Sequence, residues 1–140
     1  MRLVLDTDVI VAAVRSPKGA SSALLLAADD GVVQLLATVP LFVEYEAVTR
    51  RAEHMAAAGL SIAEIDVFLN RLVELVEPID PWFLWRPQLR DPGDEIVLEA
   101  AVNGRADALV SFNHKDFQPA AHRFGLPLLR PGEALERIRP

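Results

Sequence analysis

The sequence contains no cysteine in its 140 residues. A disulfide scaffold, a thiolate metal site and a cysteine nucleophile are therefore all excluded. Any metal ion bound by this chain must be held by oxygen or imidazole ligands. Carboxylates are the obvious supply, because the chain has 20 Asp and Glu residues.

Positive charge is scarce, and lysine is rarer still. The chain has 14 Lys and Arg residues and a net charge of −6, and its only lysines are Lys18 and Lys115. This balance argues against broad electrostatic binding to nucleic acid, which needs clustered cations that displace counterions. It leaves open a metal-bridged contact with a single scissile phosphate.

Long hydrophobic runs, low-complexity tracts and repeats at solenoid spacing are also missing. The chain enters a strand within two residues and shows no basic stretch followed by a long apolar one, so we expect neither a signal peptide nor a transmembrane helix. A cytoplasmic location is the default expectation. The length fits one domain, residues 1–140, and the 51% hydrophobic content supplies its core.

The apolar pattern predicts strands that alternate with helices. Strands are expected at residues 3–5, 32–37, 107–112 and 126–129. Helices are expected at 9–14, 21–31 (capped near Ser21), 38–57, 61–76 (with a Ser61 and Glu64 capping box), 95–104 and 131–138, with a short helix or turn at 114–125. This alternation predicts an α/β fold with a central parallel sheet covered by helices on both faces.

Four acidic residues in this layout have no cation three or four residues further on, where a helical ion pair would place one. Glu46, by contrast, has Arg50 at that spacing. Parallel sheets form their sites outside the carboxyl ends of the strands, and most of the four acids follow a strand or begin a helix. The four are Asp6, Glu44, Asp94 and Asp116.

If the four acids converge, their charges repel one another. Two unit charges about 4 Å apart repel by roughly 4 kcal/mol even at an effective dielectric constant near 20. A divalent cation would offset this repulsion, and Mg²⁺ or Mn²⁺ prefers oxygen ligands and also reaches substrate phosphates. The chemistry that follows is metal-assisted hydrolysis of a phosphodiester.

Each acid also has a purely structural explanation. Asp91 can cap a helix that has Asp94 in its first turn, and Asn113 can do the same for Asp116. Asp6 or Asp8 can cap the first helix, and Glu44 fits an ordinary boundary position at the edge of an apolar stripe. Taken singly, Asp94 and Asp116 fit capping better than ligation, so the functional interpretation depends on the joint pattern.

Four segments together resemble the PIN-domain family, whose VapC-type members form the toxin half of prokaryotic toxin-antitoxin pairs. They are "LDTDVIVAAV", "LFVEYEAV", "RDPGDEIVLEAAV" and "ALVSFNHKDF". The resemblance implies a PIN-like three-layer sandwich with a parallel sheet of about four to five strands. It further implies a Mg²⁺- or Mn²⁺-dependent ribonuclease that hydrolyses RNA phosphodiester bonds, with an antitoxin protein as partner and a homodimeric state.

Residue by residue, the resemblance implies an acidic pocket for one or two metal ions. Ser111 stands where the family commonly has a Thr or Ser that orients a water or an acid, and Asn113 is one of its alternatives to an acid. Asp8 replaces the usual Asn and adds negative charge. Asp91 and Glu95 adjoin Asp94, although the spacing favours Asp94. The implied pocket residues are Asp6, Glu44, Asp94 and Asp116.

Two other functions compete with this one. "VLDTD" also resembles the strand end of haloacid-dehalogenase phosphatases, where the first Asp is a phosphoryl nucleophile, but that family needs a suitably placed lysine and Lys115 is poorly placed. The second alternative is a catalytically silent PIN-like binding module, which usually lacks the acids. All four acids are present here.

Some other residues have both a functional and an ordinary interpretation. Trp82, Phe83, Leu84 and Trp85 could form a patch for a second copy or an antitoxin peptide, or simply pack in a loop. The histidines lack zinc-site spacing, although His114 adjoins the Asp116 motif. Candidate phosphate contacts, with ordinary surface solvation as the alternative, are Arg50, Arg51, Arg86, Arg90 and Arg105.

Overall fold

The computed structural model describes residues 1–82, 89 and 91–138. Five parallel strands form one sheet in the order β3-β2-β1-β4-β5. Leu3 in the central strand lies opposite Leu35 on one side and Ala108 on the other. The predicted parallel α/β sheet is confirmed, with strands β1 (Arg2–Leu5), β2 (Gln34–Ala37), β3 (Val76–Pro78), β4 (Ala108–Val110) and β5 (Leu128–Leu129).

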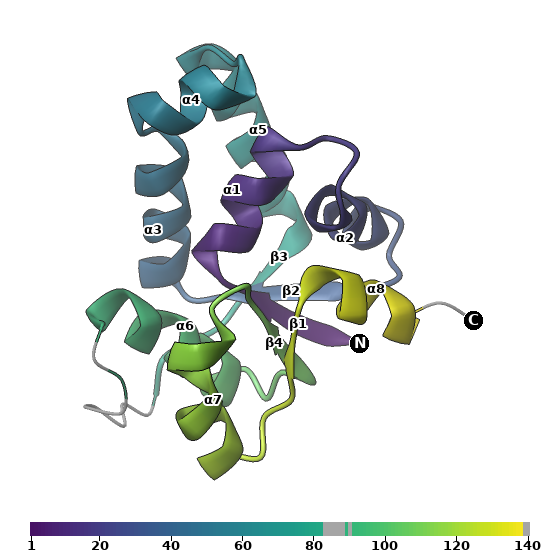
Figure 1. The fold of residues 1–140 in the computed structure, drawn as a ribbon, viewed down its shortest axis with the longest axis vertical. Coiled ribbons are helices and arrows are strands. Elements are labelled where there is room, and N and C mark those ends of the chain that lie inside the picture. The colour runs from purple at the N-terminus through teal and green to yellow at the C-terminus, as the bar shows by residue number, and fades with distance from the viewer. Residues whose placement is uncertain (83–88, 90, 139–140) are drawn as a thin grey trace.

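Helices cover both faces of this sheet and complete a three-layer sandwich (Figure 1). The first five helices connect β1 to β2 and β2 to β3, and α8 packs beside α2 on the same side. Helix α6 returns across the other face, where it contacts β1, β2 and β4, and α7 follows it there. The helices are α1 (Thr7–Arg15), α2 (Ala20–Asp29), α3 (Val39–Thr49), α4 (Ala52–Ala58), α5 (Ile62–Leu75), α6 (Pro92–Asn103), α7 (His114–Arg123) and α8 (Pro131–Ile138).

The two central strands are almost completely buried. Leu3, Val4, Leu109 and Val110 are each 0% exposed, because helices cover both faces of the sheet. Charged side chains can therefore appear only where these strands end. This explains the abrupt change from apolar residues to Asp6 near the start of the chain.

The chain order also fixes where a site can form. From β1 the next strand lies on one side, whereas from β4 the next strand lies on the other, so the topology switches between β1 and β4. A crevice opens outside the carboxyl ends of the strands at such a switch point. Residues that directly follow Leu5 and Val110 are placed there.

Three sequence-based predictions of elements were wrong. The helix expected over residues 38–57 breaks at Arg50 and Arg51, where the extended backbone of Arg51 separates α3 from α4. Ser21 does not cap α2, since Gly19 holds that position and Ser21 lies buried inside the helix. Strand β3 was not expected, because its short edge segment follows α5 directly.

Among the described residues, no single helix is long and apolar enough to cross a membrane, and only α1 with α2, bent by 98°, pass that test as a pair. The aromatic segment Trp82–Trp85, for which a contact patch and ordinary packing were both open, is described only at its first residue. Trp82 is 81% exposed there. Phe83, Leu84 and Trp85 lie outside the described residues, as do Arg86 and Arg90.

Candidate active site

Asp6 follows the central strand and is held by hydrogen bonds at both carboxylate oxygens. Its Oδ1 accepts the Thr7 N–H at 2.8 Å, and its Oδ2 accepts the Ser111 hydroxyl at 2.6 Å. The Asp6 N–H in turn donates to the Val110 carbonyl at 2.8 Å. Asp6 is also the N-cap of α1, so its capping and its place in the site are compatible. The residue is only 7% exposed, and the hydrogen bonds fix the orientation of its carboxylate.

The residues after β4 extend this network. The buried Ser111 Oγ accepts the Asn113 N–H at 2.8 Å. The Asn113 side chain donates to Asp116 Oδ2 at 3.1 Å and to Asp94 Oδ2 at 3.5 Å. Asn113 occupies the N-cap position of α7 without a side-chain capping bond, so its amide is used to join two acids instead.

Asp94 reaches the site from the first turn of α6. Asp91 caps this helix, as predicted, by accepting the Gly93 N–H at 2.8 Å, and Pro92 begins it. Asp94 itself is half-buried on the side of α6 that lies toward the ends of the strands. The cap therefore sets the orientation of the turn that carries Asp94.

Glu44 is brought to the site by its neighbour Tyr45. The Tyr45 ring is 2% exposed, and its hydroxyl donates to the Leu5 carbonyl, which ties α3 to the end of β1. Glu46 belongs to a different face of α3 and forms the predicted ion pair with Arg50, at 3.5 Å. Glu44 has no ion pair in the described part of the chain, and it lines the cleft.

These residues surround an open cleft of about 370 Å³. Three of the four acids predicted as ligands line it, namely Asp6, Glu44 and Asp94. Two further acids, Asp8 and Asp91, also line the cleft. Asp116 is exposed and does not line this cleft, but Asn113 connects it to Asp94. The structure therefore groups most of the predicted acids and holds Asp116 beside them.

The crowding of carboxylates shifts their proton affinities. Burial raises the pKa of Asp6 despite its hydrogen bond from Ser111. Burial, and then the charge of Asp6, raises the pKa of Asp8 to about 7. Burial, followed by the charges of Asp6, Asp91 and Asp116, raises the pKa of Asp94 to about 6. Burial first, and then the neighbouring negative charges, thus disfavour the ionised carboxylates, and a bound cation would offset this cost.

The donor chemistry of the cleft fits a hard divalent cation, although no ready-made cage is present. One carboxylate oxygen of Asp8, Oδ1, is buried and has no hydrogen-bond partner among the residues that the structure describes. Every acid that lines the cleft offers oxygen ligands. Within residues 1–82, 89 and 91–138, no three His, Asp or Glu side chains are grouped closely enough to hold a metal ion. Ligation would require side-chain rotation in the cleft.

The cleft also contains Arg51 and His54 from the start of α4. From the sequence, Arg51 was only one of five candidate phosphate contacts, and His54 was one of three histidines without the spacing of a zinc site. Their spacing of three residues could have indicated that both side chains lie on one face of a helix. The helix break that directs this face toward Glu44, however, has no clear signal in the sequence. Arg105 lies in the connection from α6 to β4, at the amino ends of the strands and thus opposite the cleft. His114 and His122 line a separate groove beside α7.

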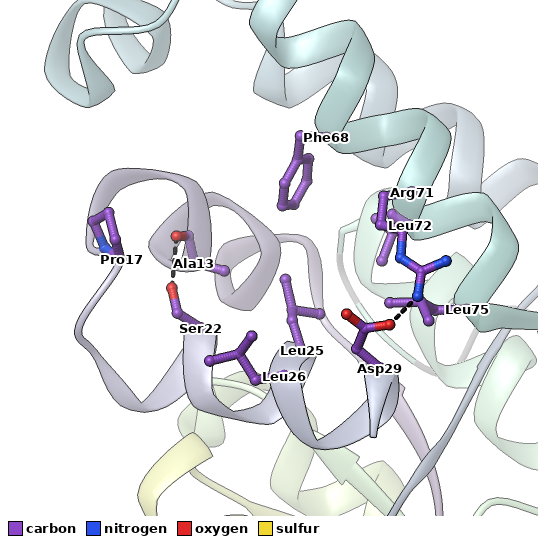
Figure 2. Close-up of a pocket in the computed structure, with 10 residues that line it drawn as sticks. All are labelled: Ala13, Pro17, Ser22, Leu25, Leu26, Asp29, Phe68, Arg71, Leu72 and Leu75. Atoms are coloured by element: carbon purple, nitrogen blue, oxygen red, sulfur yellow. Dashed lines mark hydrogen bonds and ion pairs between the residues drawn. The ribbon is translucent and has the colours of Figure 1, made fainter. Parts of the chain in front are cut away.

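A different hollow lies between α2 and α5 (Figure 2). It measures about 290 Å³ and is lined mainly by apolar side chains, among them Leu25 from α2, which points toward Phe68 and Leu72 of α5. An ion pair between Asp29 and Arg71 lies at one end of it. Its lining lacks the converging carboxylates of the Asp6 cleft, so it offers no comparable acid-based chemistry.

Comparison with known proteins identifies the family. Residues 2–115 match the PIN domain, so the chain belongs to the PIN-domain family. Solved structures that resemble it include VapBC2 from Rickettsia felis bound to a DNA fragment from their promoter, with a TM-score of 0.60 and 19% identity over 93% of this chain and 98% of that one. At this identity the likeness concerns the fold. A search of curated proteins finds no match.

Family membership sets aside the haloacid-dehalogenase alternative. The cleft geometry agrees with this, because neither lysine of the chain lines it. Lys115 lies on the groove beside α7 instead. The resemblance to PIN domains noted in the sequence is confirmed, and so is the predicted three-layer fold.

Proposed function

We propose that this protein is a Mg²⁺- or Mn²⁺-dependent ribonuclease that hydrolyses RNA phosphodiester bonds. The observation that carries the proposal is the position of Asp94, whose pKa is raised to about 6 by burial and by the charges of Asp6, Asp91 and Asp116. A site of this kind holds its acids together most favourably around a divalent cation. Membership of the PIN-domain family supports the same conclusion.

In this proposal Asp6, Glu44, Asp94 and Asp116 hold the metal, and Ser111, Asn113 and Asp8 support them. Bound Mg²⁺ or Mn²⁺ supplies Lewis-acid stabilisation of the charge that develops on the phosphate oxygens. Ser111 fixes the Asp6 carboxylate through its 2.6 Å hydrogen bond. The Asn113 amide keeps Asp94 and Asp116 at a set separation by donating to both.

We further propose that the protein is the toxin of a toxin-antitoxin pair and has an antitoxin protein as its partner. Support comes from the structural likeness to VapBC2, which is a complex bound to promoter DNA. A homodimer and a cytoplasmic location remain predictions from the sequence. A small neighbouring gene that encodes a DNA-binding protein would support the pairing.

The test is cleavage of a mixed RNA pool by purified protein with Mn²⁺, with Mg²⁺ and with EDTA. The variants are Asp94→Asn and, as a matched control, Asp80→Asn, because Asp80 is exposed and is not among the residues that line the cleft. We expect metal-dependent cleavage that EDTA and Asp94→Asn abolish and that Asp80→Asn leaves intact.

Three results would contradict the proposal. Equal cleavage by Asp94→Asn would show that the activity comes from another site or a contaminant. No cleavage by metal-loaded, antitoxin-free protein would favour the silent binding module. A phosphate monoester assayed in parallel should remain intact, since hydrolysis of it alone would indicate a phosphatase.

A further inference from the structure

Arg51 is the only cationic side chain that lines the acidic cleft in the described part of the chain. It is exposed, and it has no ion pair or side-chain capping bond among the described residues. Its neighbour Arg50 differs sharply, because Arg50 pairs with Glu46 at 3.5 Å and with Asp66 at 2.7 Å. Of these two adjacent arginines, only Arg51 has a guanidinium free to take a ligand.

The break between α3 and α4 places Arg51 on the wall of the cleft. Glu44, Val48 and Arg51 follow one another at spacings of four and three residues, and all three line the cleft. Helix α4 continues from the end of α3 that lies away from the sheet, and both helices pack against α1 (Figure 1). The cleft therefore extends from the acidic residues at the carboxyl ends of the strands to Arg51 at the start of α4.

The charge arrangement favours an anionic ligand for Arg51. A cation placed only to neutralise the acids would pair with one of them, yet Arg51 pairs with none of those described. A guanidinium offers a planar fork of N–H donors that matches two phosphate oxygens. Contacts of this kind fix the position of a nucleic-acid backbone without reading its sequence.

We propose that Arg51 binds a backbone phosphate of single-stranded RNA beside the scissile one and so sets the position of the strand along the cleft. This inference rests on the proposed ribonuclease function. It makes Arg51 a substrate-positioning residue, separate from the acids that hold the metal. One phosphate bound locally also suits a chain whose overall charge is −6.

The experiment measures binding of a fluorescein-labelled, mixed-sequence single-stranded RNA by anisotropy, in the non-cleaving Asp94→Asn background. We expect Arg51→Ala to weaken binding roughly tenfold, the scale of one hydrogen-bonded charge contact, and to lower the salt dependence by about one phosphate contact. Arg51→Lys should be intermediate, because it keeps the charge and loses the fork. Arg50→Ala is the matched control and should change affinity less than about twofold, since that side chain is already paired.

Unchanged thermal unfolding of Arg51→Ala is expected, because the side chain is exposed and makes no described hydrogen bond. In the cleaving protein, Arg51→Ala should raise KM more than it lowers kcat. The inference is overturned if Arg51→Ala binds RNA as well as its parent, or if Arg50→Ala weakens binding equally. Wild-type cleavage with no Arg51 effect would refute this inference alone. Arg51-dependent binding without any wild-type cleavage would refute the proposed function and leave the phosphate site standing.

Discussion

Ser111 donates its hydroxyl to Asp6 at 2.6 Å, which joins the ends of the two central strands across the topological switch point. The same oxygen accepts the Asn113 N–H at 2.8 Å, so one buried hydroxyl serves both an acid and the turn that leads into α7. This hydrogen bond fixes the orientation of the Asp6 carboxyl group, whose pKa burial raises. An oxygen ligand with a fixed orientation is what a cation site requires.

Ser111→Ala should lower both stability and activity. The change leaves the buried Asp6 oxygen and the Asn113 N–H without their shared partner, which costs about 1–3 kcal/mol of unfolding free energy. Loss of an orienting contact typically lowers metal affinity or activity about 10- to 100-fold. Urea unfolding and RNA cleavage measure the two effects. Ser111→Thr, which keeps the hydroxyl, should retain most activity, and equal loss in both variants would assign the effect to packing.

Asp8→Asn should raise the unfolding free energy of the metal-free protein by about 1 kcal/mol at pH 8. This value is well below what the raised pKa alone would give, because water reaches the cleft and screens the charges. Burial and the charge of Asp6 raise the pKa of Asp8 to about 7, so its ionised form is unfavourable in the fold. An Asn carbonyl can still accept the Phe112 N–H that Asp8 Oδ2 accepts at 3.2 Å. Thermal unfolding in EDTA tests this, with the exposed Asp80→Asn as control. A lower melting temperature for Asp8→Asn would contradict it.

The metal-free protein should lose stability as the pH rises from about 5 to 8. The pKa values of Asp8 and Asp94 are raised to about 7 and 6 from 3.8, so the folded chain binds more protons than the unfolded chain across this range. The unfolding free energy must then fall as the pH increases. Glu77, whose pKa Arg2 lowers, gives the opposite slope only at lower pH.

Urea unfolding in EDTA at several pH values measures this slope. The double variant Asp8→Asn with Asp94→Asn should reduce this slope, because two of the three carboxyl groups with a raised pKa are gone and only Asp6 remains. Mg²⁺ should reduce the loss at high pH, since a cation binds the deprotonated carboxylates and stabilises the fold that presents them. A wild-type protein that gains stability between pH 5 and 8 in EDTA would refute the assignment.

Much of the fold could be predicted from the sequence because its signals are local. The apolar run that ends at Asp6, the capping box of Ser61 and Glu64, and the Asp91 cap of α6 each specify an element by short-range chemistry. The break at Arg51 and the edge strand β3 could not be predicted in this way. Both depend on contacts made by distant parts of the chain, including the α4 packing on α1 and the pairing of Val76 with Leu35.

The candidate site, like the fold, has parts that could be predicted from the sequence and parts that could not. Asp6, Glu44 and Asp94 could be singled out because each lacks a local cation, and the structure does bring them to one cleft. Asp116 met the same criterion, yet it lies beside the cleft and connects through Asn113. Arg51 and His54 were not separated from other basic residues and histidines, because only the tertiary fold shows which side chains turn toward the acids.

Glu44 and Glu46 provide a final test, because they lie two residues apart on one helix and have different surroundings. Glu44 lines the acidic cleft, whereas Glu46 pairs with Arg50 on another face of α3.

Glu44→Gln should lower metal-dependent RNA cleavage about 10- to 100-fold, since it removes a charge that supports the cation. Glu46→Gln breaks an exposed ion pair that contributes little to stability, and it should leave cleavage unchanged. Cleavage rates and Mn²⁺ titrations of both variants decide the matter. If the two variants behave alike, Glu44 is an ordinary boundary residue, and the metal site consists of the aspartates alone.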